Sequence, residues 1–152
     1  MVPRKSMPGP RRWETMNRPK GQFVWFERVL LESPAWAAMP LAARRVVERV
    51  AIEHMSHGGT QNGELPVTYD DFARFGVRRQ SISAGIKAAG ALGFLDVTAR
   101  GMLGHGVAKR PSTYGLTWLP RCDGTPPSNR WKAIRSMKEA KAIVRGARCP
   151  SE

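Results

Sequence analysis

Four polar side chains fall on one face of a predicted helix between residues 79 and 87. Arg79, Ser83 and Lys87 are four residues apart and so form one row, and Gln80 lies beside the first of them. Arginine forms paired hydrogen bonds with guanine, and glutamine forms them with adenine. Serine permits a close approach, and lysine suits a phosphate oxygen. The row therefore carries side chains able to contact the base edges and backbone of a nucleic acid.

This face belongs to the second of two predicted helices joined by a tight turn. Thr68 is expected to cap the first helix together with Asp71, and Gly76 ends it because glycine tolerates left-handed geometry. The second helix is predicted over about 79–92. In a helix–turn–helix this second helix enters the major groove, and Arg78 at its start is a candidate backbone contact. The alternative is that the row is only the solvated face of an amphipathic helix.

The segments around the helix pair predict a small sheet. Residues 64–67 suggest a short strand before the pair, and residues 94–98 and 112–119 alternate as a hairpin after it. The glycine-rich hairpin tip over 99–111 is expected to approach phosphates or a minor groove, the alternative being a solvent loop. Its candidate contact residues are Arg100, His105, Lys109 and Arg110.

A further helix is predicted over about 40–56, so the order is helix, strand, helix, helix, strand, strand. This order is that of a winged helix–turn–helix, and we expect a mainly α fold with a small β-sheet, in the α+β class. The expected segments are a disordered basic arm (1–21), the winged domain (22–119), a linker (120–128), a basic amphipathic helix (129–146) and a tail (147–152).

The chain of 152 residues has a formal net charge of +13, which favours polyanionic partners. Residues 1–20 and 121–152 each carry +5, whereas residues 21–120 carry only +3. Most of the excess therefore lies at the two ends. In the N-terminal arm the candidate DNA contacts, with a solubilising tail as the alternative, are Arg4, Lys5, Arg11, Arg12 and Arg18.

Other chemistry is poorly supported by the residue pattern. His54 and His57 lie three apart at a helix end, but Glu53 is expected to point away from them. We therefore expect polar residues at a helix C-terminus, where the helix dipole favours histidine, and no metal site. Asp70 and Asp71 are adjacent in the sequence, and helix capping explains both of them. No nucleophilic side chain has a candidate base nearby in the sequence. We therefore expect no enzymatic activity and no cofactor. The cysteines, Cys122 and Cys149, are expected to be free thiols.

A resemblance to a known group rests on several short motifs. They are Ser33-Pro-Ala-Trp36, Glu53-His-Met55, Gly58-Gly59, Asn62-Gly63, Val67-Thr-Tyr-Asp-Asp-Phe72, Ala91-Leu-Gly-Phe94 and Tyr114-Gly-Leu-Thr-Trp118. Over about residues 22–135 the chain resembles small winged helix–turn–helix proteins of alphaproteobacteria, often found near mobile elements. It is also similar in layout to the winged domains of plasmid and phage replication initiators. Arg78 departs from the resemblance, because related proteins usually place Ser or Thr there as the helix cap.

The leading hypothesis is a sequence-specific double-stranded DNA-binding protein, most simply a transcriptional regulator. The alternatives are a replication-initiation or excision accessory factor of a mobile element, and a protein-interaction module on a winged-helix scaffold. RNA binding ranks lower because no exposed aromatic platform is evident. We expect a cytoplasmic, nucleoid-associated protein with no membrane-spanning segment and no indicated small-molecule effector.

Self-association is expected but not located by the sequence. A homodimer would lengthen the recognised site. Trp25, Trp36 and Trp131 lie on apolar faces that could either pair with a second copy or pack within the chain. For the C-terminal helix we expect packing within the chain through Trp131.

Overall fold

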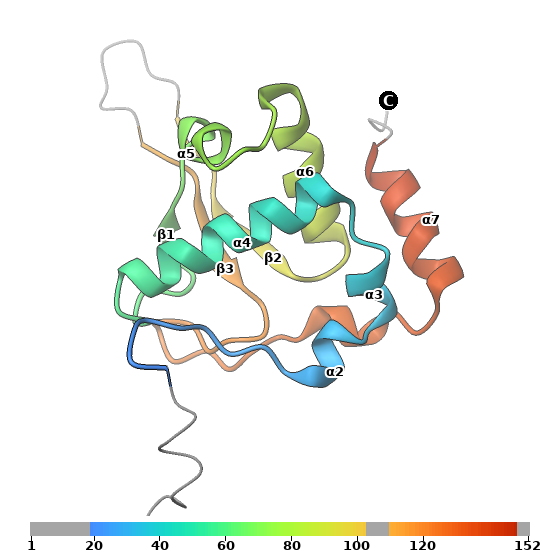
Figure 1. The fold of residues 1–152 in the computed structure, drawn as a ribbon, viewed down its shortest axis with the longest axis horizontal. Coiled ribbons are helices and arrows are strands. Elements are labelled where there is room, and N and C mark those ends of the chain that lie inside the picture. The colour runs from blue at the N-terminus through green and yellow to red at the C-terminus, as the bar shows by residue number, and fades with distance from the viewer. Residues whose placement is uncertain (1–18, 103–109, 149–152) are drawn as a thin grey trace, which may run out of the picture.

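The structure, a computed structural model, describes residues 19–102 and 110–148 and has the predicted α+β class (Figure 1). Its described part contains six α-helices, one 3-10 helix and a three-stranded sheet. The α-helices are α2 (Arg28–Leu31), α3 (Pro34–Ala37), α4 (Leu41–Ser56), α5 (Tyr69–Arg74), α6 (Arg79–Ala91) and α7 (Met137–Arg148). The 3-10 helix is η1 (Arg130–Ala133), and the strands are β1 (Leu65–Pro66), β2 (Leu95–Ala99) and β3 (Thr113–Leu116).

The sheet is antiparallel, with β3 between β1 and β2. Leu65 on β1 and Val97 on β2 both pair with Tyr114 of β3. Strand β3 ends at Leu116, earlier than the predicted 112–119, although the alternating side chains Tyr114, Leu116 and Trp118 of that stretch are all buried. The hairpin continues beyond the strands to a bridge between Met102 and Arg110.

The two-helix segment forms where the sequence predicts it. The Thr68 hydroxyl accepts a hydrogen bond from the Asp71 backbone N–H, and the Asp71 carboxylate accepts one from the Thr68 N–H, which completes the capping box. Gly76 has a φ of +98°, the left-handed geometry expected after α5. Phe72 and Val77 are buried on either side of this turn, so the angle between α5 and α6 is fixed by packing.

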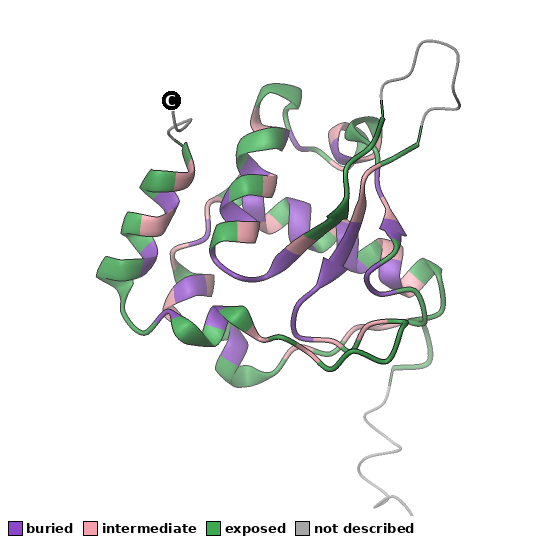
Figure 2. Ribbon diagram, turned by 180° about the vertical axis from the view of Figure 1, so that it is seen from behind, coloured by how far each residue is buried: buried purple, intermediate pink, exposed green. Residues whose placement is uncertain are grey.

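Helix α4 crosses α6 and supplies much of the core (Figures 1 and 2). Val46, Val47 and Val50 have no exposed surface. The two backbones approach closely at Gly85, where an added Cβ would lie 3.1 Å from the Ala42 carbonyl carbon and oxygen. The small residue at this position lets α6 sit against α4 while its opposite face stays outside.

The C-terminal region differs from the single helix predicted over 129–146. It forms η1, an extended residue at Ile134, and then α7. The break has a physical reason: the Ser136 hydroxyl accepts from the Glu139 N–H, and the Glu139 carboxylate accepts from the Arg135 N–H. These bonds favour a new helix start, whereas the basic and apolar spacing alone suggested one continuous helix.

Trp131 anchors this region within the chain, as predicted. Its ring is buried and stacks on Phe94 at a centroid distance of 6.3 Å. Gly93, with a φ of +83°, allows the close approach, because an added Cβ would lie 2.5 Å from the Trp131 backbone nitrogen. The C-terminal segment therefore packs on the same core as the helix pair.

Candidate nucleic-acid interface

The predicted row lies on the outer face of α6. Arg78, Arg79, Gln80, Ser83 and Lys87 are all exposed. The opposite face of the helix is buried through Ile82, Gly85, Ala88 and Ala89. The structure therefore leaves the five predicted side chains accessible, and the start of α6 lies at the same end of the molecule as α5 and the hairpin (Figure 1).

Arg79 forms an ion pair that could not be predicted from the sequence. Its guanidinium pairs with the carboxylate of Asp70 on α5. Both side chains are about two thirds exposed, at 66% and 65%. Exposed ion pairs contribute about 0–1 kcal/mol, so a competing partner can displace Asp70 at little cost. The side chains of Arg78, Gln80, Ser83 and Lys87 make no hydrogen bond or ion pair with the described residues.

The start of α6 differs from the start of α5 in its capping. Arg78 occupies the N-cap position and its side chain makes no capping hydrogen bond, in contrast to Thr68 at α5. The first N–H groups of an α-helix lack partners within the helix and carry a partial positive charge. The Ser81 N–H donates to the Arg78 carbonyl at 2.8 Å, and the N–H groups of Arg79 and Gln80 remain as donors beside exposed arginines. This arrangement is suited to a phosphate.

The hairpin contributes two of its four predicted residues to the described structure. Arg100 and Arg110 are exposed near its tip. The base is held by a hydrogen bond between the Thr98 and Thr113 hydroxyls and by the Gly101 N–H donating to the Ser112 hydroxyl. His105 and Lys109 lie outside the described residues.

The five predicted arm residues, Arg4, Lys5, Arg11, Arg12 and Arg18, also lie outside the described residues. The described chain starts at Pro19, at the end of the molecule opposite the hairpin and the start of α6 (Figure 1). The point at which the N-terminal arm joins the described chain therefore lies far from the exposed row on α6.

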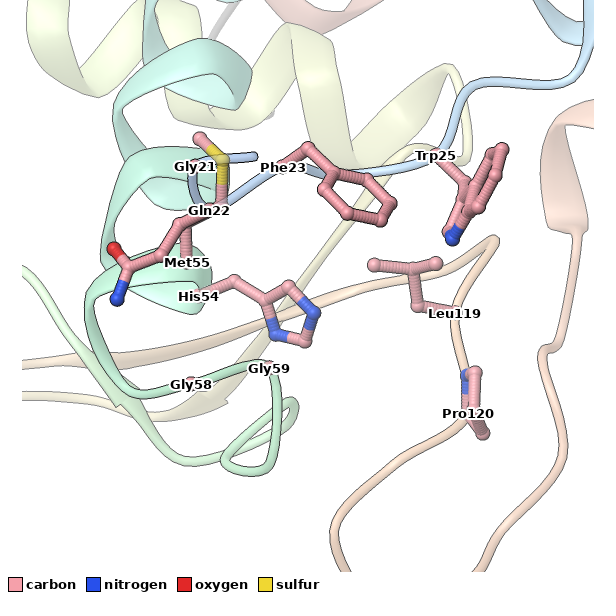
Figure 3. Close-up of a pocket in the computed structure, with 10 residues that line it drawn as sticks. All are labelled: Gly21, Gln22, Phe23, Trp25, His54, Met55, Gly58, Gly59, Leu119 and Pro120. Atoms are coloured by element: carbon pink, nitrogen blue, oxygen red, sulfur yellow. The ribbon is translucent and has the colours of Figure 1, made fainter. Parts of the chain in front are cut away.

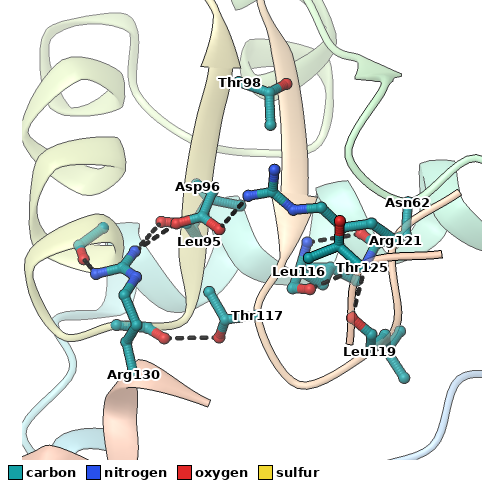
Figure 4. A network of polar contacts seen from close by, with 12 residues as sticks. Asn62, Leu95, Asp96, Thr98, Leu116, Thr117, Leu119, Arg121, Thr125 and Arg130 are labelled. Carbon is teal, nitrogen blue, oxygen red and sulfur yellow. Dashed lines mark hydrogen bonds and ion pairs between the residues drawn. The ribbon is translucent and has the colours of Figure 1, made fainter. Parts of the chain in front are cut away.

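A second region that sequence reasoning missed is a polar network beside strands β2 and β3 (Figure 4). The Asn62 amide nitrogen donates to the carbonyls of Leu116, Leu119 and Pro120, and its oxygen accepts from the Leu116 N–H. Asp96 pairs with Arg121 at 2.7 Å and with Arg130 at 2.6 Å. The network fixes the end of the hairpin and the segment that follows it. In the sequence, Gln61-Asn62-Gly63 is typical of a turn, and this pattern gives no indication of the distant partners.

Glu53 was expected to point away from both histidines, but it lies four residues before His57 and its carboxylate oxygen is 3.0 Å from His57 Nε2. His54, expected as one of the polar residues at this helix end, is buried. It is 8% exposed and lies beside a hollow of about 400 Å³ bordered by Phe23, Met55 and Leu119 (Figure 3). Its Nδ1 has no hydrogen-bond partner among the described residues. Burial lowers the pKa of His54 from its usual 6.5, because the charged ring loses its hydration.

This burial predicts a pH-dependent stability. Below pH 6.5 the unfolded chain binds a proton at His54 before the folded chain does, so stability is complete above pH 6.5 and falls as the pH drops toward the folded pKa. We expect the urea midpoint of the His54→Met variant to change less between pH 7.5 and 5.5 than that of the native chain. Val47→Ala is the control, since it removes buried volume and should lower both midpoints alike. Equal pH dependence in His54→Met and the native chain would contradict the prediction.

Among the described residues there is no cluster of three or more His, Cys, Asp or Glu side chains able to hold a metal ion. Across the same residues, no helix has the length and apolarity needed to cross a bilayer. Comparisons with protein-family models, curated proteins and solved structures found no match to this chain.

Proposed function

We propose that this protein binds double-stranded DNA in a sequence-specific way, most simply as a transcriptional regulator. Helix α6 enters the major groove, and the hairpin tip over 99–111 contacts the adjacent backbone or minor groove. The observation that carries the proposal is the exposed row of Arg79, Gln80, Ser83 and Lys87 on the second helix of the pair.

The topology supports this proposal. From α4 to β3 the elements follow the order helix, strand, helix, helix, strand, strand, and the hairpin leaves the sheet beside the helix pair. This is the order of a winged helix–turn–helix. In helix–turn–helix proteins the second helix presents its N-terminal residues to base edges while the first crosses the backbone.

The chemistry of each side chain in the row suits the place that it would take in a major groove. Arg79 and Gln80 lie in the first turn of α6, where paired hydrogen bonds to guanine and adenine are formed. Ser83 and Ala84 are small and exposed, which allows the helix to lie deep in the groove. Arg78 and the uncapped start of α6 suit a backbone phosphate.

Pairing of two copies on one site is part of the proposal, because one domain contacts only a few base pairs. Trp131 is buried and Trp36 packs against Phe26 and Phe94. Trp25, by contrast, is 68% exposed, so of the three tryptophans it is the one whose ring remains available for contact with a second copy.

Selection of bound duplexes from a random DNA library tests the proposal. We expect enrichment of one short motif, bound much more tightly than a scrambled duplex of the same composition. Occurrence of the motif near a promoter favours a regulator, and several direct repeats at an origin favour a replication or excision role on a mobile element. Failure to enrich any motif would overturn the proposal and favour a protein-interaction module.

A further inference from the structure

Helix α7 lies directly beside the proposed recognition helix. Ala140 and Val144 of α7 are buried, and Ile143 packs against the same core, which joins α7 to α6 and α3. The two long helices run in opposite directions, so the C-terminal end of α7 lies near the N-terminal end of α6 (Figure 1). Seen from behind, α6 lies between α7 and the β2–β3 hairpin (Figure 2).

The outer side of α7 carries a basic stripe, which we define as Lys138, Lys141, Arg145 and Arg148. These residues are spaced three or four apart, so they share one side of the helix, and all four are exposed. None of their side chains forms an ion pair or hydrogen bond with another described residue. The only acidic residue of α7 is Glu139, whose carboxylate accepts from the Arg135 N–H at the start of the helix.

The position of α7 is set by contacts of the segment before it, and the charged side chains of α7 itself are not needed to hold the helix in place. Arg130 donates to the carbonyls of Gly90 and Leu95 and pairs with Asp96 (Figure 4). Trp131 stacks on Phe94 next to this ion pair. These contacts hold the segment that leads into α7, so the basic stripe is presented at a constant place relative to α6.

We propose that the basic stripe of α7 is a second DNA-contact surface, which binds backbone phosphates along one edge of the groove that α6 occupies. This inference rests on the proposed function. Packed helices are about 8–10 Å apart, and the major groove is about 12 Å wide. A helix packed beside one in the groove therefore lies over the flanking phosphates. The hairpin covers the other side, so α6 is bracketed by two backbone contacts.

The test is a comparison of charge-matched variants. Lys141→Gln with Arg145→Gln removes two charges from the stripe, and Lys20→Gln with Arg28→Gln removes two exposed charges from the N-terminal part of the described chain. On the duplex selected with the native chain, we expect the α7 variant to lose about ten-fold in affinity and to lower the salt slope by about 1.8, or 0.9 per phosphate contact. Its preference for the selected over a scrambled duplex should not change, because phosphate contacts carry no sequence information.

Two further measurements make the outcome decisive. The conservative pair Lys141→Arg with Arg145→Lys keeps both charges and should restore the affinity and the salt slope. Thermal unfolding should show that all variants keep the native midpoint, since the substituted side chains are exposed. Equal affinities and salt slopes for the α7 variant and the Lys20/Arg28 control would overturn the inference while leaving DNA binding by α6 intact. A native chain that binds no duplex would instead overturn the proposed function, and the inference with it.

Discussion

Replacing Asn62 with aspartate is expected to destabilise the protein by about 3–5 kcal/mol. Asn62 is 1% exposed, and its amide nitrogen donates to three carbonyls at 2.9–3.1 Å. Aspartate has nearly the same shape, but its carboxylate cannot donate and would place a buried negative charge against three carbonyl oxygens. Since small domains are stable by about 5–15 kcal/mol, this single change removes a large part of the total.

Urea unfolding at neutral pH measures this effect. Gln61→Glu is the matched control, because it makes the same change from amide to carboxylate at the neighbouring exposed residue. We expect the control to stay within about 0.5 kcal/mol of the native chain. If Asn62→Asp were no more destabilising than Gln61→Glu, the polar network would not hold the hairpin and the segment after it as described.

Elements governed by local signals could be predicted from the sequence. The capping pair Thr68 and Asp71 and the glycine at 76 placed α5 and the turn, and α6 was expected over 79–92 and forms at Arg79–Ala91. The exposed row on α6 followed from helical spacing alone. In these segments the residues that decide the structure are neighbours in the chain.

Features that depend on distant partners could not be predicted in this way. The partners of Asn62 lie 54 to 58 residues further along the chain, so the sequence showed only a turn. The pairing of Arg79 with Asp70 requires the angle between α5 and α6. The burial of His54 depends on Phe23, Leu119 and the N-terminal segment that lies across it.

The break between η1 and α7 is a different case, because its signal was present. Ser136-Met-Lys-Glu139 is a helix-start pattern, but the apolar spacing from Trp131 to Val144 is nearly continuous. Burial of Trp131 against Phe94 and of Ile134 in the core acts together with the capping bonds of Ser136 and Glu139 to separate the two pieces. Tertiary packing therefore favours two separate helices over the one continuous helix that the apolar spacing suggests.

The second large effect concerns the first turn of α6. Replacing Arg79 and Gln80 together with alanine is expected to remove two paired base contacts, each contributing about 1–3 kcal/mol. The combined loss corresponds to about 30-fold or more in affinity for the selected duplex. Neither side chain is buried, so the fold should be retained. The loss of the Arg79–Asp70 pair should have little effect on stability, because both partners are largely exposed.

Arg28→Ala is the control for the lost charge. Its side chain is 88% exposed on α2, away from the helix pair. It removes one positive charge, as the α6 variant does, but no proposed base contact. It should weaken binding to selected and scrambled duplexes slightly and to the same extent.

The ratio of affinities for the selected and scrambled duplexes, measured for the native chain and the Arg79→Ala, Gln80→Ala variant at one salt concentration, tests the central claim most directly. We expect the native chain to prefer the selected duplex strongly, the α6 variant to lose about 30-fold or more of that preference, and Arg28→Ala to keep it. An α6 variant that retains the native ratio would contradict the assignment of α6 as the helix that contacts the bases.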